Sequence, residues 1–178
     1  MHAAAEKKAI AKKALRFIQN GMVVLTGGGT VMLELARIIP KDLDATFFTV
    51  SPLVALEIAQ CSPVKAILVG GQLTHDSYIC TGASVVNQLA EIKADLCFLG
   101  TNGLSVKEGI TEHDWDVALV KKAMIQSALK TVILSISEKL NSVQHMKVCT
   151  LKAVDYLVTE LNPQDHQLRK YSKVVKVK

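Results

Sequence analysis

The residues best suited to binding chemistry form a turn of three consecutive glycines, Gly27, Gly28 and Gly29, followed by Thr30. The turn lies between a short apolar strand pattern and a helix pattern within residues 23–36. Glycines let the backbone turn tightly and bring its N–H groups close to a ligand. We expect the Thr30 hydroxyl to cap the helix, whose free N–H groups and dipole attract anions. The turn therefore suits a phosphate or carboxylate, although an ordinary turn without a ligand would use the same residues.

The same arrangement recurs after four more apolar runs, at residues 45–48, 66–69, 96–99 and 131–134. Helical patterns separate most of these runs, which predicts an α/β fold with a largely parallel sheet and helices on both faces. Such sheets bind ligands at the carboxyl ends of their strands, so we expect one shared polar pocket there. Independent turn chemistry at each strand end is the simpler alternative. Beyond the glycine turn, the pocket is expected to include Thr49, Ser51, Gly70, Gly71, Gly100, Asn102, Gly103, Ser137 and Lys139.

Apolar periodicity predicts the elements that would position this pocket. We expect helices over residues 6–18, 30–38, 52–59, 84–92 and 114–129, a late strand over 156–159 and an edge strand over 174–177. Together they describe one ligand-sensing domain over residues 1–178. Its leading helix lies within 6–20, and residues 162–178 hold a C-terminal helix and the edge strand.

Two helix starts carry recognisable caps. Ser51 is predicted to cap the helix that begins at Pro52, because proline suits the first helical position. Asp114 is predicted to cap the long helix that follows it. In that helix we expect Trp115, Leu119 and Ala123 to face the core.

Composition fits a globular domain without a metal or another cofactor. Hydrophobic residues make up 49% of the 178 residues, while aromatic residues make up 4% and leave few rings for stacking on nucleic acid. No apolar stretch is long enough to cross a bilayer, and no secretory signal opens the chain. The histidines show no metal-ligand spacing. Four scattered cysteines indicate a reducing cytoplasm and no metal site: Cys61, Cys80, Cys97 and Cys149.

The net charge of +5 comes from the two ends of the chain. Residues 17–168 hold 11 basic and 15 acidic residues, so the body is mildly acidic. Basic ends could contact DNA or a partner, but solvated helix faces and tails explain them more simply. The terminal cations are Lys7, Lys8, Lys12, Lys13, Arg16, Arg169, Lys170, Lys173, Lys176 and Lys178.

Across nearly its whole length the chain resembles the C-terminal effector domain of DeoR-type bacterial transcription regulators. The resemblance rests on the order and spacing of several segments: GTVMLELA, TVSPLVALEIA, AILVGGQL, ADLCFLGTNGLSVKEGIT, VKKAMI and LSISEK. It implies the fold of ribose-5-phosphate isomerase and a role in sensing a phosphorylated sugar or a similar metabolite. Such regulators carry an N-terminal winged helix-turn-helix that this sequence lacks. We therefore expect DNA to be bound only through that missing module, no membrane association, a homo-oligomer, and a natural start upstream of Met1.

This sequence matches the site residues of the family at some positions and departs from them at others. Residues at matching positions are Gly29, Thr30, Thr49, Ser51, Gly70, Gly71, Gly100, Gly103, Thr111, Lys121 and Lys139. Three polar positions are lost, because Gly27 and Ile136 replace aspartates and Val50 replaces an asparagine. Two carboxylates and an amide that could hold sugar hydroxyls are thus missing. The pocket should still attract an anion, while its ligand could differ from the usual sugar phosphate or be absent.

Three charged positions need a choice between chemistry and ordinary structure. Lys139 follows a strand end and suits a phosphate, although a solvated loop lysine fits equally. Neighbouring helical residues point about 100° apart, so Lys121 and Lys122 cannot both face the pocket, and the resemblance favours Lys121. Glu112 and His113 resemble an acid–base pair with Asp114, but we expect both to be exposed beside a helix cap.

These observations predict the effector-binding domain of a repressor or activator. A sugar-phosphate isomerase or deaminase of the same fold is the main alternative, because fold does not settle function. Against catalysis, the strand-end motifs lack a carboxylate that could act as a general base. A dimerisation module with a vestigial pocket is the third reading.

Overall fold

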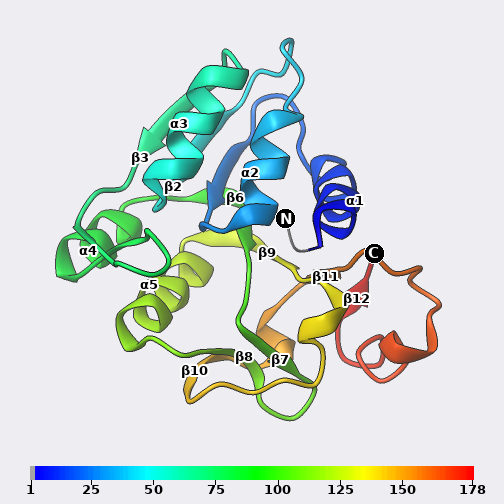
Figure 1. Ribbon diagram of the computed structural model, residues 1–178. Coiled ribbons are helices and arrows are strands. Elements are labelled where there is room, and N and C mark those ends of the chain that lie inside the picture. Colours follow the sequence, from blue (N-terminus) through cyan, green and yellow to red (C-terminus); the bar gives the residue numbers. More distant parts are fainter. Residues whose placement is uncertain (1–2) are drawn as a thin grey trace.

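Seven strands form a parallel central sheet, which confirms the predicted α/β architecture (Figure 1). The computed structural model describes residues 3–178. In spatial order across the sheet, the strands are β12 (Lys176–Val177), β11 (Tyr156–Val158), β9 (Ala128–Leu134), β6 (Ala94–Leu99), β1 (Val23–Thr26), β2 (Thr46–Thr49) and β3 (Lys65–Leu68). Every neighbouring pair runs parallel, so the carboxyl ends of all strands meet at one edge.

Helices cover both faces of this sheet. One face carries α1 (Ala4–Leu15), α2 (Thr30–Arg37) and α3 (Pro52–Cys61), and the other carries α4 (Ala83–Ala90) and α5 (Trp115–Gln126). Short 3₁₀ helices follow as η1 (Ser137–Lys139), η2 (Leu151–Ala153) and η3 (His166–Leu168). Within residues 3–178, every helix is too short or too polar to span a membrane.

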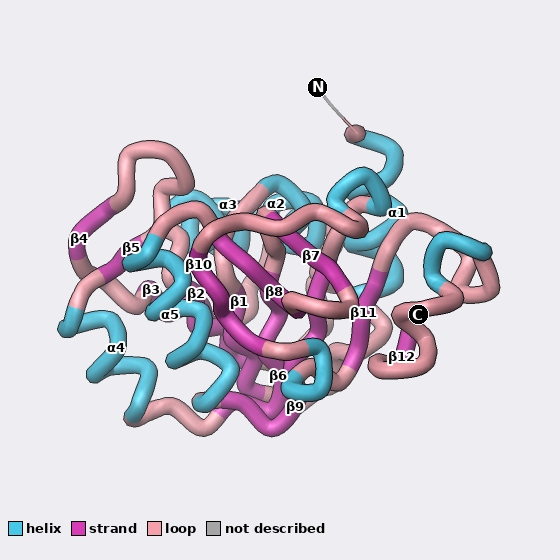
Figure 2. The backbone as a smooth tube through the Cα atoms, turned by 90° about the horizontal axis from the view of Figure 1, so that it is seen from below, coloured by secondary structure: helices cyan, strands magenta, loops and turns pink. Residues whose placement is uncertain are grey.

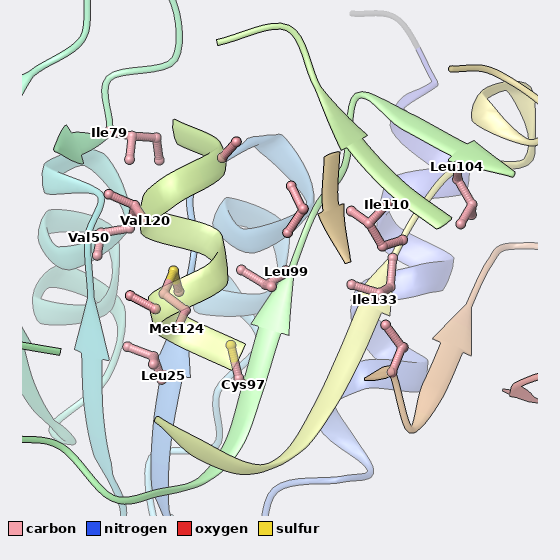
Figure 3. Packing of buried hydrophobic residues seen from close by; sticks show 14 of the residues in the cluster. Leu25, Val50, Ile79, Cys97, Leu99, Leu104, Ile110, Val120, Met124 and Ile133 are labelled. Carbon is pink, nitrogen blue, oxygen red and sulfur yellow. The ribbon is translucent and has the colours of Figure 1, made fainter. Parts of the chain in front are cut away.

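The strands separate two hydrophobic clusters because alternate side chains point to opposite faces. Val24 packs under α1 and α2, whereas its neighbour Leu25 faces α5. Leu25, Cys97 and Met124 lie together in the close view of the second cluster (Figure 3). Cys97 is fully buried, as expected for a small core residue, and burial raises the pKa of its thiol.

Two small antiparallel sheets that periodicity did not predict complete the fold. Strands β4 (Gln72–Leu73) and β5 (Cys80–Thr81) form a hairpin before α4. Strands β7 (Gly103–Ser105), β8 (Gly109–Glu112) and β10 (Met146–Cys149) form a three-stranded sheet in the order β10-β8-β7 (Figure 2). This sheet places Leu104 and Ile110 against the core (Figure 3).

The predicted core face of α5 is rotated. Trp115 is 56% exposed and Leu119 is 37% exposed, whereas Val117, Val120 and Met124 are buried. Ala123, the third residue of the predicted stripe, is buried as expected, because it lies next to Val120 around the helix, whereas Trp115 and Leu119 lie on a neighbouring, half-exposed face. The expected inward orientation of Trp115 and Leu119 is therefore wrong.

The C-terminal segment contributes to the core with little regular structure. In place of the expected C-terminal helix, a single 3₁₀ turn, η3, begins at His166, and the Asp165 carboxylate accepts a hydrogen bond from the N–H of Gln167 at 2.9 Å. Strand β12 occupies two residues of the expected edge strand. Tyr171 is fully buried, which fixes this segment against the body of the domain.

Candidate functional site

A cleft of about 420 Å³ opens at the carboxyl ends of the central strands. Its walls are the turn after β1, the start of α3, the loop between β4 and β5, the exit of β6 and the inner face of α5. Eight of the predicted site residues line it: Gly28, Gly29, Thr30, Ser51, Gly100, Asn102, Lys121 and Lys139. The strand ends after β1, β2, β6 and β9 thus share one cavity, while the end of β3 at Gly70 and Gly71 lies outside it.

The glycine turn gives the cleft an uncapped helix start. Gly29, with φ of +103°, is the N-cap of α2, and no side chain caps this end. The expected cap by the Thr30 hydroxyl is therefore wrong, because Thr30 is already the first helical residue. The first N–H groups of a helix have no intrahelical partner, so this end offers donors and a positive dipole to the cleft.

Close packing explains the glycine at position 28. A Cβ atom at Gly28 would collide with the side chain of Ile79 and crowd that of Ser51 at 3.2 Å. Ile79 belongs to the loop between β4 and β5, so that loop rests directly on the glycine turn. Ser51 caps α3 as predicted, because its hydroxyl accepts a hydrogen bond from the N–H of Val54 at 3.4 Å.

A buried carboxylate, Glu112, lies in the cleft between two donors. It is fully buried, its Oε1 contacts the Lys121 ammonium, and its Oε2 accepts a hydrogen bond from the Asn102 amide at 2.6 Å. The expectation that Glu112 is exposed is wrong, because β8 turns its last side chain inward. His113 is exposed and Asp114 caps α5, both as predicted.

Two lysine side chains hydrogen-bond to the backbone that follows β6. The Lys121 ammonium donates to the Gly100 carbonyl at 2.7 Å, and the Lys139 ammonium donates to the Thr101 carbonyl at 2.8 Å. Burial lowers the pKa of Lys139, and the nearby charge of Lys121 lowers it further. Lys122 points elsewhere, with its ammonium 5.8 Å from the centroid of the Trp115 ring. The choice of Lys121 as the cleft-facing lysine agrees with this arrangement.

The remaining predicted site residues lie outside the cleft: Thr49, Gly70, Gly71, Gly103, Thr111 and Ser137. Thr49 is buried and accepts a hydrogen bond from the N–H of Ser51 at 3.1 Å. Thr111 accepts one from the N–H of Gln144 at 2.9 Å, and its hydroxyl fills the space beside Gly103.

Structural roles also account for the other three of these residues. The Gly70 carbonyl accepts a hydrogen bond from the Gln88 amide at 2.9 Å, and Gly71 packs against the backbone of Thr81. Ser137 donates to the carboxylate of Glu160 through its N–H and its hydroxyl. These six residues serve the cleft at most indirectly, through the turns that carry its lining.

Sequence reasoning missed three parts of the cleft. One is the loop at Asp76, Ser77 and Tyr78, which reaches the cleft through the β4–β5 hairpin. Another is the buried state of Glu112, which depends on the pairing of β8 with β7 and β10. The third is the apolar wall of Leu33 and Leu53 from α2 and α3. Within residues 3–178, His, Cys, Asp and Glu side chains do not gather in threes that could hold a metal ion.

Solved structures with the same fold include sugar-phosphate enzymes. Ribose 5-phosphate isomerase A from Methanocaldococcus jannaschii matches with a TM-score of 0.55 and 19% identity, covering 78% of this chain and 55% of that one. The eIF2B delta protein from Chaetomium thermophilum matches with a TM-score of 0.59 and 15% identity, covering 88% of this chain and 57% of that one. At these identities the likeness shows the fold alone.

Curated relatives are transcription regulators. The HTH-type transcriptional regulator GlpR from Haloferax volcanii is 33% identical over 155 residues, covering 86% of this chain and 60% of the relative. A putative aga operon transcriptional repressor from Escherichia coli O157:H7 is 26% identical, covering 88% of this chain and 58% of the relative. This chain thus spans about 60% of the length of such relatives. The family model described as the DeoR C terminal sensor domain matches residues 2–161. The chain belongs to the DeoR C-terminal sensor domain family.

Proposed function

We propose that the cleft binds a phosphorylated sugar or a similar small anionic metabolite and that this binding controls transcription. The observation that carries the proposal is the placement of Lys139 in the same cleft as the uncapped start of α2. A helix start with free N–H groups and a lysine ammonium are both features that bind phosphate in proteins. Both lie in a cavity whose volume suits a small metabolite.

The charges of the cleft argue for a ligand with one anionic end. Lys121 is already neutralised by Glu112, so Lys139 and the helix start remain for the anion. The side-chain oxygen of Asn102 and the Asp76 carboxylate offer hydrogen-bond acceptors to hydroxyls. The apolar wall at Leu33 and Leu53 can cover the carbon skeleton of a sugar. This division between an anion end and a hydroxyl end matches a sugar phosphate better than inorganic phosphate.

Control of transcription requires the ligand to prefer one state of the regulator. A ligand shifts an equilibrium only by its differential affinity for the two states. The β4–β5 loop is placed to respond, since Ile79 rests on the glycine turn and Tyr78 lines the cleft. In this proposal, DNA is bound by a separate helix-turn-helix module, and the domain acts as a homo-oligomer.

One observation favours an alternative function, which is catalysis in the cleft. Glu112 supplies a carboxylate in a fold shared with isomerases, where the strand-end motifs alone had offered none. Each of its oxygens nevertheless contacts a neighbouring side chain, Lys121 or Asn102, and these contacts give the carboxylate a structural role in joining α5 to the loop after β6. We therefore propose binding without turnover.

Thermal unfolding tests the proposal directly. Glucose 6-phosphate, ribose 5-phosphate and a panel of other sugar phosphates are compared with the corresponding free sugars. A ligand at a hundredfold excess over its dissociation constant adds about 2.7 kcal/mol to stability, which shifts the melting temperature measurably. We expect shifts with one or more phosphorylated sugars and none with their unphosphorylated forms.

Variants connect the shift to the cleft. Lys139→Met should abolish it, whereas Lys122→Met, which removes a lysine from the outer face of α5, should preserve it. Equal shifts with free sugars, or no shift across the panel, would contradict the proposal and favour the vestigial dimerisation module. Steady conversion of ribose 5-phosphate to ribulose 5-phosphate that Glu112→Gln abolishes would support the isomerase.

A further inference from the structure

A second concavity of about 540 Å³ lies between the end of α1 and the C-terminal segment. Its lining residues are Lys13, Arg16, Phe17, Tyr156, Pro163 and Lys178, and it shares none of them with the cleft. Residues from near both ends of the chain meet here, since α1 and β12 lie on the same side of the molecule (Figures 1 and 2). Three of the ten terminal basic residues are thus brought into one site: Lys13, Arg16 and Lys178.

Two aromatic rings form an apolar wall of this concavity. Phe17 and Tyr156 contact edge to face, with ring centroids 4.9 Å apart and an interplanar angle of 64°. Phe17 also meets the buried ring of Phe98, at 6.3 Å between centroids, which anchors the pair to the sheet. Phe17, Tyr156 and the ring of Pro163 therefore present a firm, partly exposed apolar surface.

Cations surround the Tyr156 ring. Lys176 stands opposite Tyr156 in the register of β11 and β12, with its ammonium 5.8 Å from the ring centroid. The ammonium of Lys130, from β9 on the other side of β11, lies 5.9 Å from the same centroid. Lys13 and Arg16 line the concavity with the two rings, whereas Lys130 and Lys176 lie near the Tyr156 ring without lining the concavity.

Among the described residues, three of these cations have no carboxylate paired with them: Arg16, Lys130 and Lys176. Within residues 3–178, none of these three forms an ion pair, whereas the charge of Glu160 acts on Lys13. Lys13 donates to the backbone oxygens of Thr159, Leu161 and Lys178 at 2.8, 2.7 and 3.4 Å, and burial lowers its pKa. The nearby carboxylate of Glu160 is engaged by Ser137. A bound polyanion would relieve the repulsion among these like charges.

We propose that this concavity binds a nucleoside phosphate, with the base against Tyr156 and Phe17 and the phosphates held by the surrounding lysines and Arg16. The volume of this concavity is in the range of small-molecule sites. Flat apolar rings accept an unpaired base by stacking, which a base within a duplex cannot provide. The ammonium groups near the Tyr156 ring would contact the phosphates attached to a base that packs against the apolar wall.

Calorimetric titration of the full chain with ADP, adenosine and pyrophosphate tests the proposal. ADP should bind more tightly than either fragment, because it uses the rings and the cations together. Tyr156→Leu keeps an apolar side chain but removes the ring, and should weaken ADP binding about tenfold while leaving pyrophosphate binding unchanged. Arg16→Ala should weaken binding of both phosphorylated compounds.

Matched variants separate this site from general charge effects and from the cleft. Lys107→Ala removes an exposed lysine from the turn between β7 and β8 and should leave ADP binding unchanged. Lys139→Met should also leave it unchanged, because Lys139 belongs to the cleft. Undetectable ADP binding at millimolar concentration would overturn the proposal, as would pyrophosphate binding that equals ADP binding. Duplex DNA that binds more tightly than ADP, with no loss in Tyr156→Leu, would identify a backbone-contacting surface instead.

Discussion

The ammonium of Lys121 contacts the carboxylate of Glu112 inside the cleft, with the two side chains 13% and 0% exposed. The contact joins the middle of α5 to the last residue of β8. A buried ion pair is costly to break from one side, because the remaining charge stays desolvated. This pair therefore fixes the relation between α5 and the three-stranded sheet as well as the charge of the cleft.

Removing one partner of this pair should cost more than removing both charges. We expect Lys121→Met to lower the free energy of unfolding by about 3–5 kcal/mol, since it leaves the buried Glu112 carboxylate uncompensated. Adding Glu112→Gln should recover most of that loss. Denaturant unfolding of the two single variants and the double variant measures the coupling. Additive losses in the double variant would show that the two side chains act independently.

Packing at the glycine turn predicts a selective loss of binding. Gly28→Ala places a methyl group against Ile79 and Ser51, which should displace the β4–β5 loop and weaken anion binding. Gly70→Ala is the matched control, because a Cβ atom there meets nothing within 4 Å and φ is not positive. Ligand-induced melting shifts in both variants make the comparison. Loss of binding in Gly70→Ala alone would place the anion near β3 instead.

Ligand affinity should depend on pH through Lys139. Burial lowers its pKa below the usual 10.5, so the ammonium loses its proton at a lower pH than an exposed lysine does. Affinity for a phosphorylated ligand should therefore fall as pH rises through that lowered pKa. Lys139→Arg keeps its charge at all accessible pH values and should remove the fall. Titrations of both proteins across the alkaline range test this, and identical pH profiles would exclude Lys139 as the anion ligand.

The same shift has the opposite effect on stability without a ligand. Between the lowered pKa and 10.5, the unfolded chain holds a proton at Lys139 that the folded chain has lost. The contribution of Lys139 to the free energy of unfolding therefore rises with pH across this window. In the wild-type chain, stability should rise and anion affinity should fall as pH rises through this window. Loss of both pH dependences in Lys139→Arg would identify Lys139 as the group responsible.

The C-terminal segment should be required for folding. The Tyr171 hydroxyl lies 3.1 Å from the Leu104 carbonyl and 3.0 Å from the Asn141 side-chain oxygen, and it accepts from the N–H of Asn141 at 2.9 Å. Tyr171→Phe should cost about 1–3 kcal/mol, because it leaves buried polar groups without a partner. Removal of residues 162–178 should prevent cooperative unfolding, which circular dichroism measures. A truncated chain as stable as the full one would contradict this role.

The sequence predicted those parts of the fold that depend on neighbours along the chain. The cap at Ser51, the cap at Asp114 and the strand–glycine–helix turn are local patterns, and each element appears within a few residues of its expected bounds. The α5 face was misassigned because Trp115 and Leu119 are as apolar as the residues that are actually buried.

The incomplete prediction of the cleft has a similar cause. Polarity at a strand end does not tell whether a side chain points into the cleft or completes a turn, as Thr49 and Ser51 show. The buried position of Glu112 depends on antiparallel pairing between β8 and β10, which join residues far apart in sequence. Periodicity cannot report such a contact, because the short strands carry no alternation of their own.

The leading helix α1 is an integral part of the folded body. Ile10 and Ala14 are fully buried under the sheet, and the Lys13 ammonium bonds to carbonyls beyond the end of β11. A helix packed in this way moves as a rigid body with the sheet and transmits rotation and translation, whereas a flexible linker would transmit neither. The sheet would therefore set the orientation of a segment joined to the start of α1. A small tilt of this helix would produce a larger displacement at the far end of that segment.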